Sequence, residues 1–193
     1  MPDDASVLRD AMKKVAVTLK QADIPFALAG GYAAFARGGP EPDHDVDFYV
    51  REEDVEAAVK VLDDAGLRIV RPPEDWLVKV FYDDAMVDLI FGPTGMPVTA
   101  EVLARAGEVE VDSVWMPVLS ATDLLTSKLL ALSEHYCDFA ALFPTARALR
   151  EQVDWRDVRR RSGDNPFAVA FLDLVVSLGI VDAVDTAPTP TRS

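Results

Sequence analysis

Residues 26–50, with the sequence FALAGGYAAFARGGPEPDHDVDFYV, constrain the fold of this chain more than any other stretch. A short apolar segment runs into two glycines, and a second apolar segment carries Asp45 and Asp47 on either side of Val46. Because side chains alternate between the faces of a strand, the two aspartates share one face, roughly 6–7 Å apart. Two like charges so placed repel unless a cation lies between them, and Mg²⁺ prefers oxygen ligands. The stretch therefore predicts a magnesium site on one face of a β-sheet.

Hydrophobic periodicity predicts a mixed α/β half followed by a helical half. Helices are expected at 4–21 and 53–65, strands at 26–29, 45–50, 67–70, 76–82, 85–91, 108–111 and 114–119, and hairpin turns at 83–84 and 112–113. A start resembling a capping box at Ser120 opens a region that reads as helical to about Gly179. The expected domains are an α/β domain over 1–119, a C-terminal helical region over 120–182 and a flexible tail over 183–193.

The composition excludes several classes of protein. The formal net charge is −14, which disfavours a surface that grips nucleic acid all over. Cys137 is the single cysteine, so no internal disulfide forms, and no Cys/His cluster has zinc spacing. The charged N-terminal segment lacks the apolar core of a signal peptide, and no apolar run approaches a membrane span of about 20 residues. A cytoplasmic location without membrane partners is expected by default.

The combination of Gly30-Gly31, a spacer, Asp45-Val46-Asp47-Phe48 and a later Asp88 in MVDLIF resembles the nucleotidyltransferase superfamily. Further along, TSKLLAL and HYCDFAALF resemble the AbiEii-type and MenT-type toxin branch of that superfamily. The resemblance covers roughly residues 24–161 and implies the nucleotidyltransferase fold, a mixed β-sheet with flanking helices followed by a C-terminal helical bundle. It also implies transfer of a nucleoside monophosphate from an NTP to an acceptor hydroxyl.

The resemblance assigns a role to each acidic residue of the motif. Asp45 and Asp47 bind two Mg²⁺ ions, and Asp88 binds the nucleophile-side ion and orients or deprotonates the acceptor hydroxyl. Gly30 and Gly31 let backbone N–H groups approach the triphosphate beside a helix N-terminus. The bland alternative is that the carboxylates face solvent on strand surfaces.

Three further residues are candidates for nucleotide binding. Lys128 matches a phosphate-binding lysine of the toxins, although a lysine beside an apolar stripe also snorkels outward. Asp138 matches an aspartate of that branch, although helix capping explains it equally well. Arg37 supplies positive charge that the motif otherwise lacks, because Glu41 and Asp43 stand where relatives place a basic residue and a threonine.

An arginine-rich stretch, ARALREQVDWRDVRRR, forms a basic island at residues 146–161. One interpretation is an RNA-binding surface on which Trp155 stacks against a base. The other is an exposed helix pair in which Glu151, Asp154 and Asp157 neutralise the arginines. The candidate RNA-binding residues are Arg147, Arg150, Trp155, Arg156, Arg159 and Arg160, with Arg161 beside them.

The resemblance leaves three functions open. The first is a toxin, paired with a cognate antitoxin, that adds nucleotides to tRNA 3′ ends. The second is a nucleotidyltransferase that modifies a small molecule such as an aminoglycoside, for which an acidic protein is suited. The third is a degenerate, non-catalytic nucleotide-binding module, which the extra charges of Glu41 and Asp43 favour.

Overall fold

The computed structural model describes residues 4–42 and 45–183 and is built around one seven-stranded sheet. Its strand order is β3-β4-β5-β2-β1-β7-β6. The strands are β1 (Phe26–Ala29), β2 (Val46–Val50), β3 (Arg68–Val70), β4 (Leu77–Tyr82), β5 (Ala85–Ile90), β6 (Gly107–Val111) and β7 (Val114–Val118). β2 pairs with β5, and β1 with β7, in parallel, whereas the other neighbours are antiparallel. The sheet is therefore mixed, as the sequence predicts.

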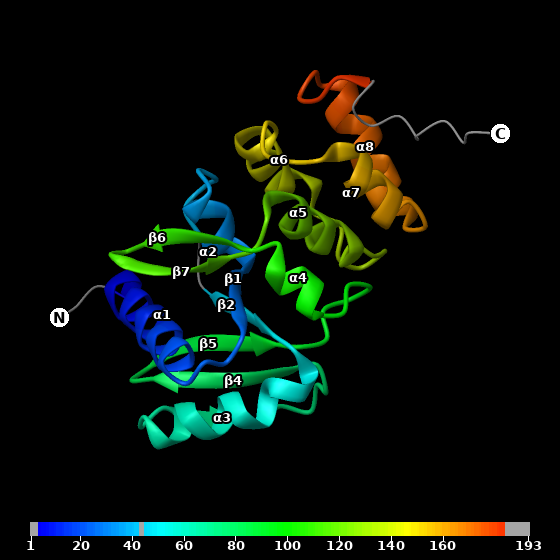
Figure 1. Cartoon of the computed structure of the whole chain (residues 1–193). Coiled ribbons are helices and arrows are strands. Elements are labelled where there is room, and N and C mark those ends of the chain that lie inside the picture. The colour runs from blue at the N-terminus through cyan, green and yellow to red at the C-terminus, as the bar shows by residue number, and fades with distance from the viewer. Residues whose placement is uncertain (1–3, 43–44, 184–193) are drawn as a thin grey trace.

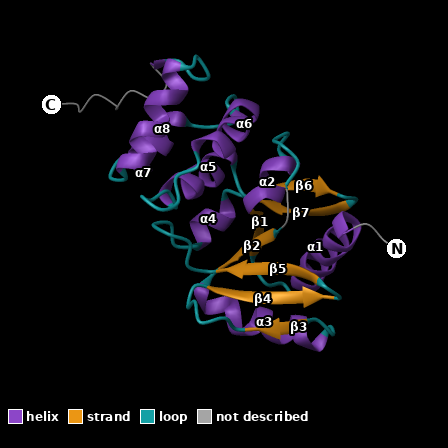
Figure 2. Ribbon diagram, turned by 180° about the vertical axis from the view of Figure 1, so that it is seen from behind, coloured by secondary structure: helices purple, strands orange, loops and turns teal. Residues whose placement is uncertain are grey.

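Helices cover the sheet and extend beyond it. They are α1 (Asp4–Gln21), α2 (Gly30–Ala36), α3 (Val55–Asp64) after the short 3-10 turn η1 (Glu52–Asp54), α4 (Ala100–Ala104), α5 (Ala121–Leu130), α6 (Phe139–Leu149), α7 (Trp155–Ser162) and α8 (Pro166–Ser177). The helices α5–α8 gather at one end of the sheet, next to α4 (Figure 1). Seen from behind, α3 lies along β3 and β4 at the other end (Figure 2). Among the described residues, none of the helices combines the length and the apolar character needed to cross a membrane.

Strand alternation divides the side chains of the sheet between two environments. Val46 and Phe48 point to the face that α1 covers and are fully buried. Tyr49, one residue on from Phe48, points to the other face and packs in a second cluster with Val102 of α4. Asp47 lies on this second face as well, because it is two residues from Tyr49. The sheet thus presents its carboxylates away from the main core.

Tight turns fix the register of two hairpins. β4 and β5 pair from Tyr82 opposite Ala85 around Asp83-Asp84, and Asp83 has φ +50°. β6 and β7 pair around Asp112-Ser113, which have φ values of +47° and +68°. Positive φ at the turn matches the twist of the flanking strands. Both hairpins were expected from the sequence at these turns.

Two differences from the expected elements have physical reasons. The helix α4 was not expected, because at five residues it is too short to show helical periodicity. The helical region after Ser120 is interrupted between α5 and α6, where Ser133 and Tyr136 exchange backbone hydrogen bonds of 2.9 and 3.1 Å. The remaining helices begin at the capping residues Asp138, Asp154 and Asn165. The division of the chain at residue 119 stays a prediction.

Candidate active site

A row of residues at one level of the sheet brings the predicted carboxylates together. Lys79 on β4 pairs with Asp88 on β5, Asp88 pairs with Asp47 on β2, and Asp47 pairs with Ala29 on β1. Adjacent strands lie about 4.8 Å apart, so Asp47 and Asp88 are immediate neighbours on one face. Asp45 is exposed and directly precedes β2, so it lies outside the strand that was expected to include it.

Gly30 is required where β1 gives way to α2. Its φ is +61°, and a Cβ atom there would lie 1.8 Å from Oδ2 of Asp47. No other residue type fits this position without displacing the carboxylate. Gly31 follows, and a Cβ on it would lie 2.9 Å from Cβ of Pro42. Gly30 thus allows the Asp47 carboxylate to pack directly against the backbone at the start of α2, and Gly31 allows the close approach of Pro42.

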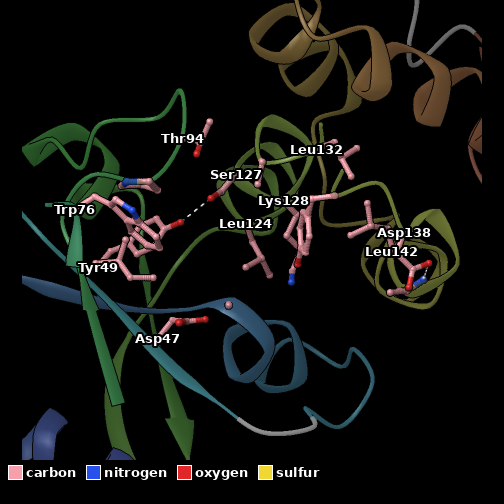
Figure 3. A pocket seen from close by; sticks show the side chains of 16 residues that line it. Asp47, Tyr49, Trp76, Thr94, Leu124, Ser127, Lys128, Leu132, Asp138 and Leu142 are labelled. Atoms are coloured by element: carbon pink, nitrogen blue, oxygen red, sulfur yellow. Dashed lines mark hydrogen bonds between the residues drawn. The ribbon is translucent and has the colours of Figure 1, made fainter. Parts of the chain in front are cut away.

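This carboxylate opens into a cavity of about 450 Å³ between the sheet and the C-terminal helices. Asp47 and Lys128 enter it from opposite walls, while Trp76 and Asp138 lie toward opposite ends (Figure 3). The lining also includes Gly30, Tyr49, Ile90, Pro93, Thr94, Leu124, Ser127, Ala131, Leu132, Tyr136, Ala141 and Leu142. An acidic floor, one cation and largely apolar ends are suited to a ligand that carries both phosphate and ring systems.

A hydrogen bond between the sheet and α5 positions Lys128. Tyr49 Oη and Ser127 Oγ lie 2.5 Å apart, which holds the middle of α5 over β2 (Figure 3). Lys128, the next residue in α5, projects into the cavity above Asp47. Burial lowers the pKa of the Lys128 ammonium, and the charges of Asp47 and Asp45 oppose this shift. The lysine thus points at the site instead of snorkelling outward.

The negative charges of Asp47 and Asp88 are only partly offset by the nearby lysines. Burial, together with the charges of Asp45 and Asp88, raises the pKa of Asp47 to about 7 against the opposing effect of Lys128 and Lys79. Burial also raises the pKa of Asp88, although the hydrogen bond from Lys79 counteracts the shift. Excess negative charge at this point favours the binding of a cation.

This charge predicts how the stability of the metal-free protein depends on pH. The folded-state pKa of Asp47 is raised, so the folded protein binds a proton at this carboxyl more tightly than the unfolded chain does. The resulting contribution to the unfolding free energy is complete below about pH 4 and is lost as the pH rises through about 7. Asp47→Asn removes the titration. We expect the variant to match the wild type near pH 4 and to exceed its unfolding free energy by about 2–4 kcal/mol at pH 8. Urea denaturation in the presence of a chelator measures both values, and a difference that does not vary with pH would contradict the assignment.

The donor chemistry fits a hard divalent cation. Asp47 and Asp88 offer only oxygen atoms, and the nearby lysines offset their charge only in part, which suits Mg²⁺. Among residues 4–42 and 45–183, however, no three His, Cys, Asp or Glu side chains are grouped closely enough to hold a metal as they stand. Asp45 acts on Asp47 through its charge, and Asp43, at which the motif departs from its relatives, lies outside the described residues. Glu41 is 3.5 Å from Arg9 and does not line the cavity.

The other nucleotide-binding candidates are placed differently from one another. Asp138 lines the cavity and also caps α6, because its Oδ1 accepts a hydrogen bond of 3.2 Å from the N–H of Ala141. Arg37 does not line the cavity. Its guanidinium donates to the carbonyl oxygens of Leu119 and Val118, at 2.5 and 2.8 Å. The structure therefore gives Asp138 two roles and ties Arg37 to the end of β7.

The arginine-rich stretch is engaged within the protein. The side chain of Trp155 is 4% exposed and its Nε1 donates to the carbonyl of Arg150 at 2.9 Å, so the expectation that it stacks on a base is wrong. Arg159 pairs with Asp173 at 3.1 Å, and Arg160 pairs with Asp157. Further pairs join Arg150 to Glu151 and Arg161 to Asp123 and Asp157, while Arg147 is exposed in the last turn of α6 and Arg156 is exposed in α7. This arrangement corresponds to the second interpretation of the stretch, in which acidic side chains of the protein neutralise the arginines.

Lys79 and Trp76 were not singled out from the sequence. The hairpin turn at Asp83-Asp84 places Lys79 opposite Asp88 once the register is counted outward, and this was a usable signal. Trp76 is 40% exposed beside β4 and carried no such signal, because its neighbours in the cavity come from distant segments.

Comparisons with known proteins agree on the fold. A family model described as "Uncharacterised nucleotidyltransferase" matches residues 3–189. The solution structure of the antibiotic-resistance factor ANT(2″)-Ia is similar with a TM-score of 0.57 and 13% identity, over 88% of this chain and 97% of that chain. A putative nucleotidyltransferase from H. pylori gives 0.55 and 18% over 92% and 81%.

The lincosamide antibiotic adenylyltransferase LnuA, bound to lincomycin, is similar with a TM-score of 0.50 and 13% identity, over 70% of this chain and 92% of that chain. No curated protein sequence matches the chain. At these identities the structural likeness supports the fold, a mixed sheet with flanking helices. The AbiEii/MenT branch is not distinguished by these matches.

Proposed function

We propose, since the chain belongs to the nucleotidyltransferase family whose model spans it, that the protein transfers a nucleoside monophosphate from an NTP to an acceptor hydroxyl with Mg²⁺. One observation carries the proposal. Asp47 lines the floor of a cavity, against Gly30 and beneath Lys128, and Asp88 is its neighbour on the adjacent strand. Neighbouring carboxylates beside a cavity supply the kind of oxygen ligands that two-metal phosphoryl chemistry uses.

In this proposal, the acidic residues of the site bind the metal ions. Asp45, Asp47 and Asp88 are the residues that would hold two Mg²⁺ ions, which supply activation of the hydroxyl and neutralisation of the leaving pyrophosphate. Asp88 orients the acceptor hydroxyl and takes up its proton. Asp47 is fixed by its contact with Gly30, so it can accept a cation with little rearrangement.

Lys128 and the paired glycines bind the triphosphate. The ammonium of Lys128 faces Asp47 across the cavity and can reach phosphate oxygens placed between them. The backbone N–H groups at Gly30 and Gly31, without a Cβ in the way, add hydrogen bonds at the start of α2. Asp138 and the apolar lining beside it form one end of the cavity, where we place the nucleoside.

We propose the 3′ end of a tRNA as the acceptor to test first. The motifs around Lys128 and Asp138 resemble those of the AbiEii-type and MenT-type toxins, and this resemblance supports the assignment. A toxin of this type pairs with an antitoxin, so a cognate antitoxin is the partner that the proposal implies.

A small hydroxyl-bearing molecule is the second candidate acceptor. Two observations favour it: the arginines expected to bind RNA mostly pair with carboxylates of the protein, and Trp155 is buried. An acceptor with amino groups would also be attracted by the net charge of −14. A crystal structure of ANT(2″)-Ia contains adenylyl-2″-tobramycin, so a similar fold accommodates such a molecule.

A label-transfer assay decides between the acceptors. The protein is incubated with Mg²⁺ and each labelled NTP, with either a tRNA pool or an aminoglycoside panel. We expect the label to appear on RNA, and the charge reversal Arg147→Glu to lower that transfer several-fold without affecting a small acceptor. Label only on the small molecules would support the second candidate. Label on neither, together with no Mg²⁺-dependent binding of NTP, would leave a non-catalytic module.

A further inference from the structure

Lys79 lies in the same row of the sheet as the two carboxylates. It stands at the centre of β4, directly opposite Asp88, and Asp88 stands directly opposite Asp47. Its Nζ is 3.2 Å from Oδ1 and 3.4 Å from Oδ2 of Asp88. The ammonium also lies 3.3 Å from the sulfur of Met86. A single cation is therefore shared by both oxygens of the third carboxylate.

Lys79 approaches Asp88 from β4, which lies on the opposite side of β5 from β2 and Asp47. The Lys79 side chain is 28% exposed and that of Asp88 is 13% exposed, so the pair is only partly screened by water. A carboxylate oxygen that accepts a hydrogen bond from an ammonium is a poorer ligand for a second cation, because both compete for the same negative charge. Lys79 is thus positioned to influence any cation that binds Asp88.

We propose that Lys79 is a positioning residue that holds Asp88 in the metal-free protein and weakens the binding of the divalent cation by competing for that carboxylate. The inference rests on the proposed function, because it takes Asp88 as a metal ligand. Lys79 reduces the repulsion between the carboxylates before the metal binds, and it lets the metal be exchanged instead of held permanently.

A role for Lys79 that is only structural predicts the opposite sign. Loss of a structural support would disorder Asp88 and weaken metal binding. Loss of a competitor leaves Asp88 available and strengthens metal binding. The direction of the change in metal affinity therefore separates the two roles.

The test measures Mn²⁺ binding, in the absence of nucleotide, by the electron paramagnetic resonance signal of the free ion. We expect Lys79→Met and Lys79→Gln to lower the dissociation constant about tenfold, in line with the loss of one charge-assisted hydrogen bond. Lys79→Arg keeps the positive charge and should remain within about twofold of the wild type. Lys60→Met removes a comparable ammonium–carboxylate pair, Lys60–Asp64 at 2.6 Å on α3, and should change nothing.

The outcomes separate this inference from the proposed function. An unchanged or weaker affinity in both neutral variants, with tight binding in the wild type, would overturn the inference and leave the metal site intact. Absence of Mn²⁺ binding from the wild type and from both neutral variants would overturn the inference and the metal site together. Near-ultraviolet circular dichroism confirms that each variant is folded, and two different neutral replacements guard against a packing defect specific to one of them.

Discussion

Replacement of Asp47 by asparagine is expected to abolish nucleotidyl transfer, with a loss of rate on the order of 10³-fold or more. Asp47 is the carboxylate packed on Gly30, next to Asp88 and below Lys128, so the change removes the charge at the centre of the row. The amide has nearly the same shape, and so the fold is retained. Transfer of label from an NTP to the acceptor, followed over time, measures the loss.

The matched control is Asp84→Asn, which makes the same chemical change in the exposed turn between β4 and β5. This variant should retain the activity of the wild type. Transfer that survives Asp47→Asn at more than about a tenth of the wild-type rate would show that this carboxylate is not needed for the chemistry. The same result would leave the pairing of Asp47 with Asp88 as a feature of the sheet alone.

Of the substitutions considered, replacement of Asp123 by alanine should lower the unfolding free energy most, by about 3 kcal/mol. Asp123 is fully buried in α5, and its oxygens accept hydrogen bonds from Arg105, Arg161 and Ser120 at 2.7–2.9 Å. Burial alone raises the pKa of this carboxyl, yet these three donors together hold it below its ordinary value. Without the carboxylate, Arg161 is left largely buried without its closest counter-charge.

Urea denaturation at pH 7 measures this effect. Glu151→Ala serves as the control, because it removes a carboxylate from an exposed pair with Arg150 and should change the unfolding free energy by less than about 1 kcal/mol. A loss below about 1 kcal/mol for Asp123→Ala would mean that the two arginines find other partners at little cost. The contacts of Asp123 join α5 to α7 and to Arg105 at the end of α4, so the loss reports on the junction of the sheet with the C-terminal helices.

Local rules were sufficient to predict the sheet and its acidic face. The alternation of Asp45, Val46, Asp47 and Phe48 decided which face is buried, because Phe48 and Val46 are fully buried and the carboxylates are not. The two-residue turn at Asp83-Asp84 fixed the register of β4 and β5, since the pairing is counted outward from the turn. That register also determines that Lys79 meets Asp88.

Long-range packing determines the features of the structure that local sequence patterns could not predict. Trp155 lies among arginines, yet its ring is buried because α5 and α7 pack together, and nothing in the local pattern specifies this partner. Arg105, the residue that directly follows the unexpected helix α4, meets Asp123, which lies 18 residues further along the chain. The placement of α5 over β2, and with it of Lys128, involves the hydrogen bond between Tyr49 and Ser127, which lie 78 residues apart along the chain.

Calorimetric titration of a non-hydrolysable NTP analogue, with and without Mg²⁺, tests most directly whether the paired carboxylates form a metal-dependent nucleotide site. The wild-type protein should bind the analogue in the presence of Mg²⁺ and lose at least about tenfold in affinity when the metal is chelated. Asp47→Asn should show weak binding under both conditions. Binding by the wild type that is equally tight without Mg²⁺, or that Asp47→Asn leaves unchanged, would contradict the account.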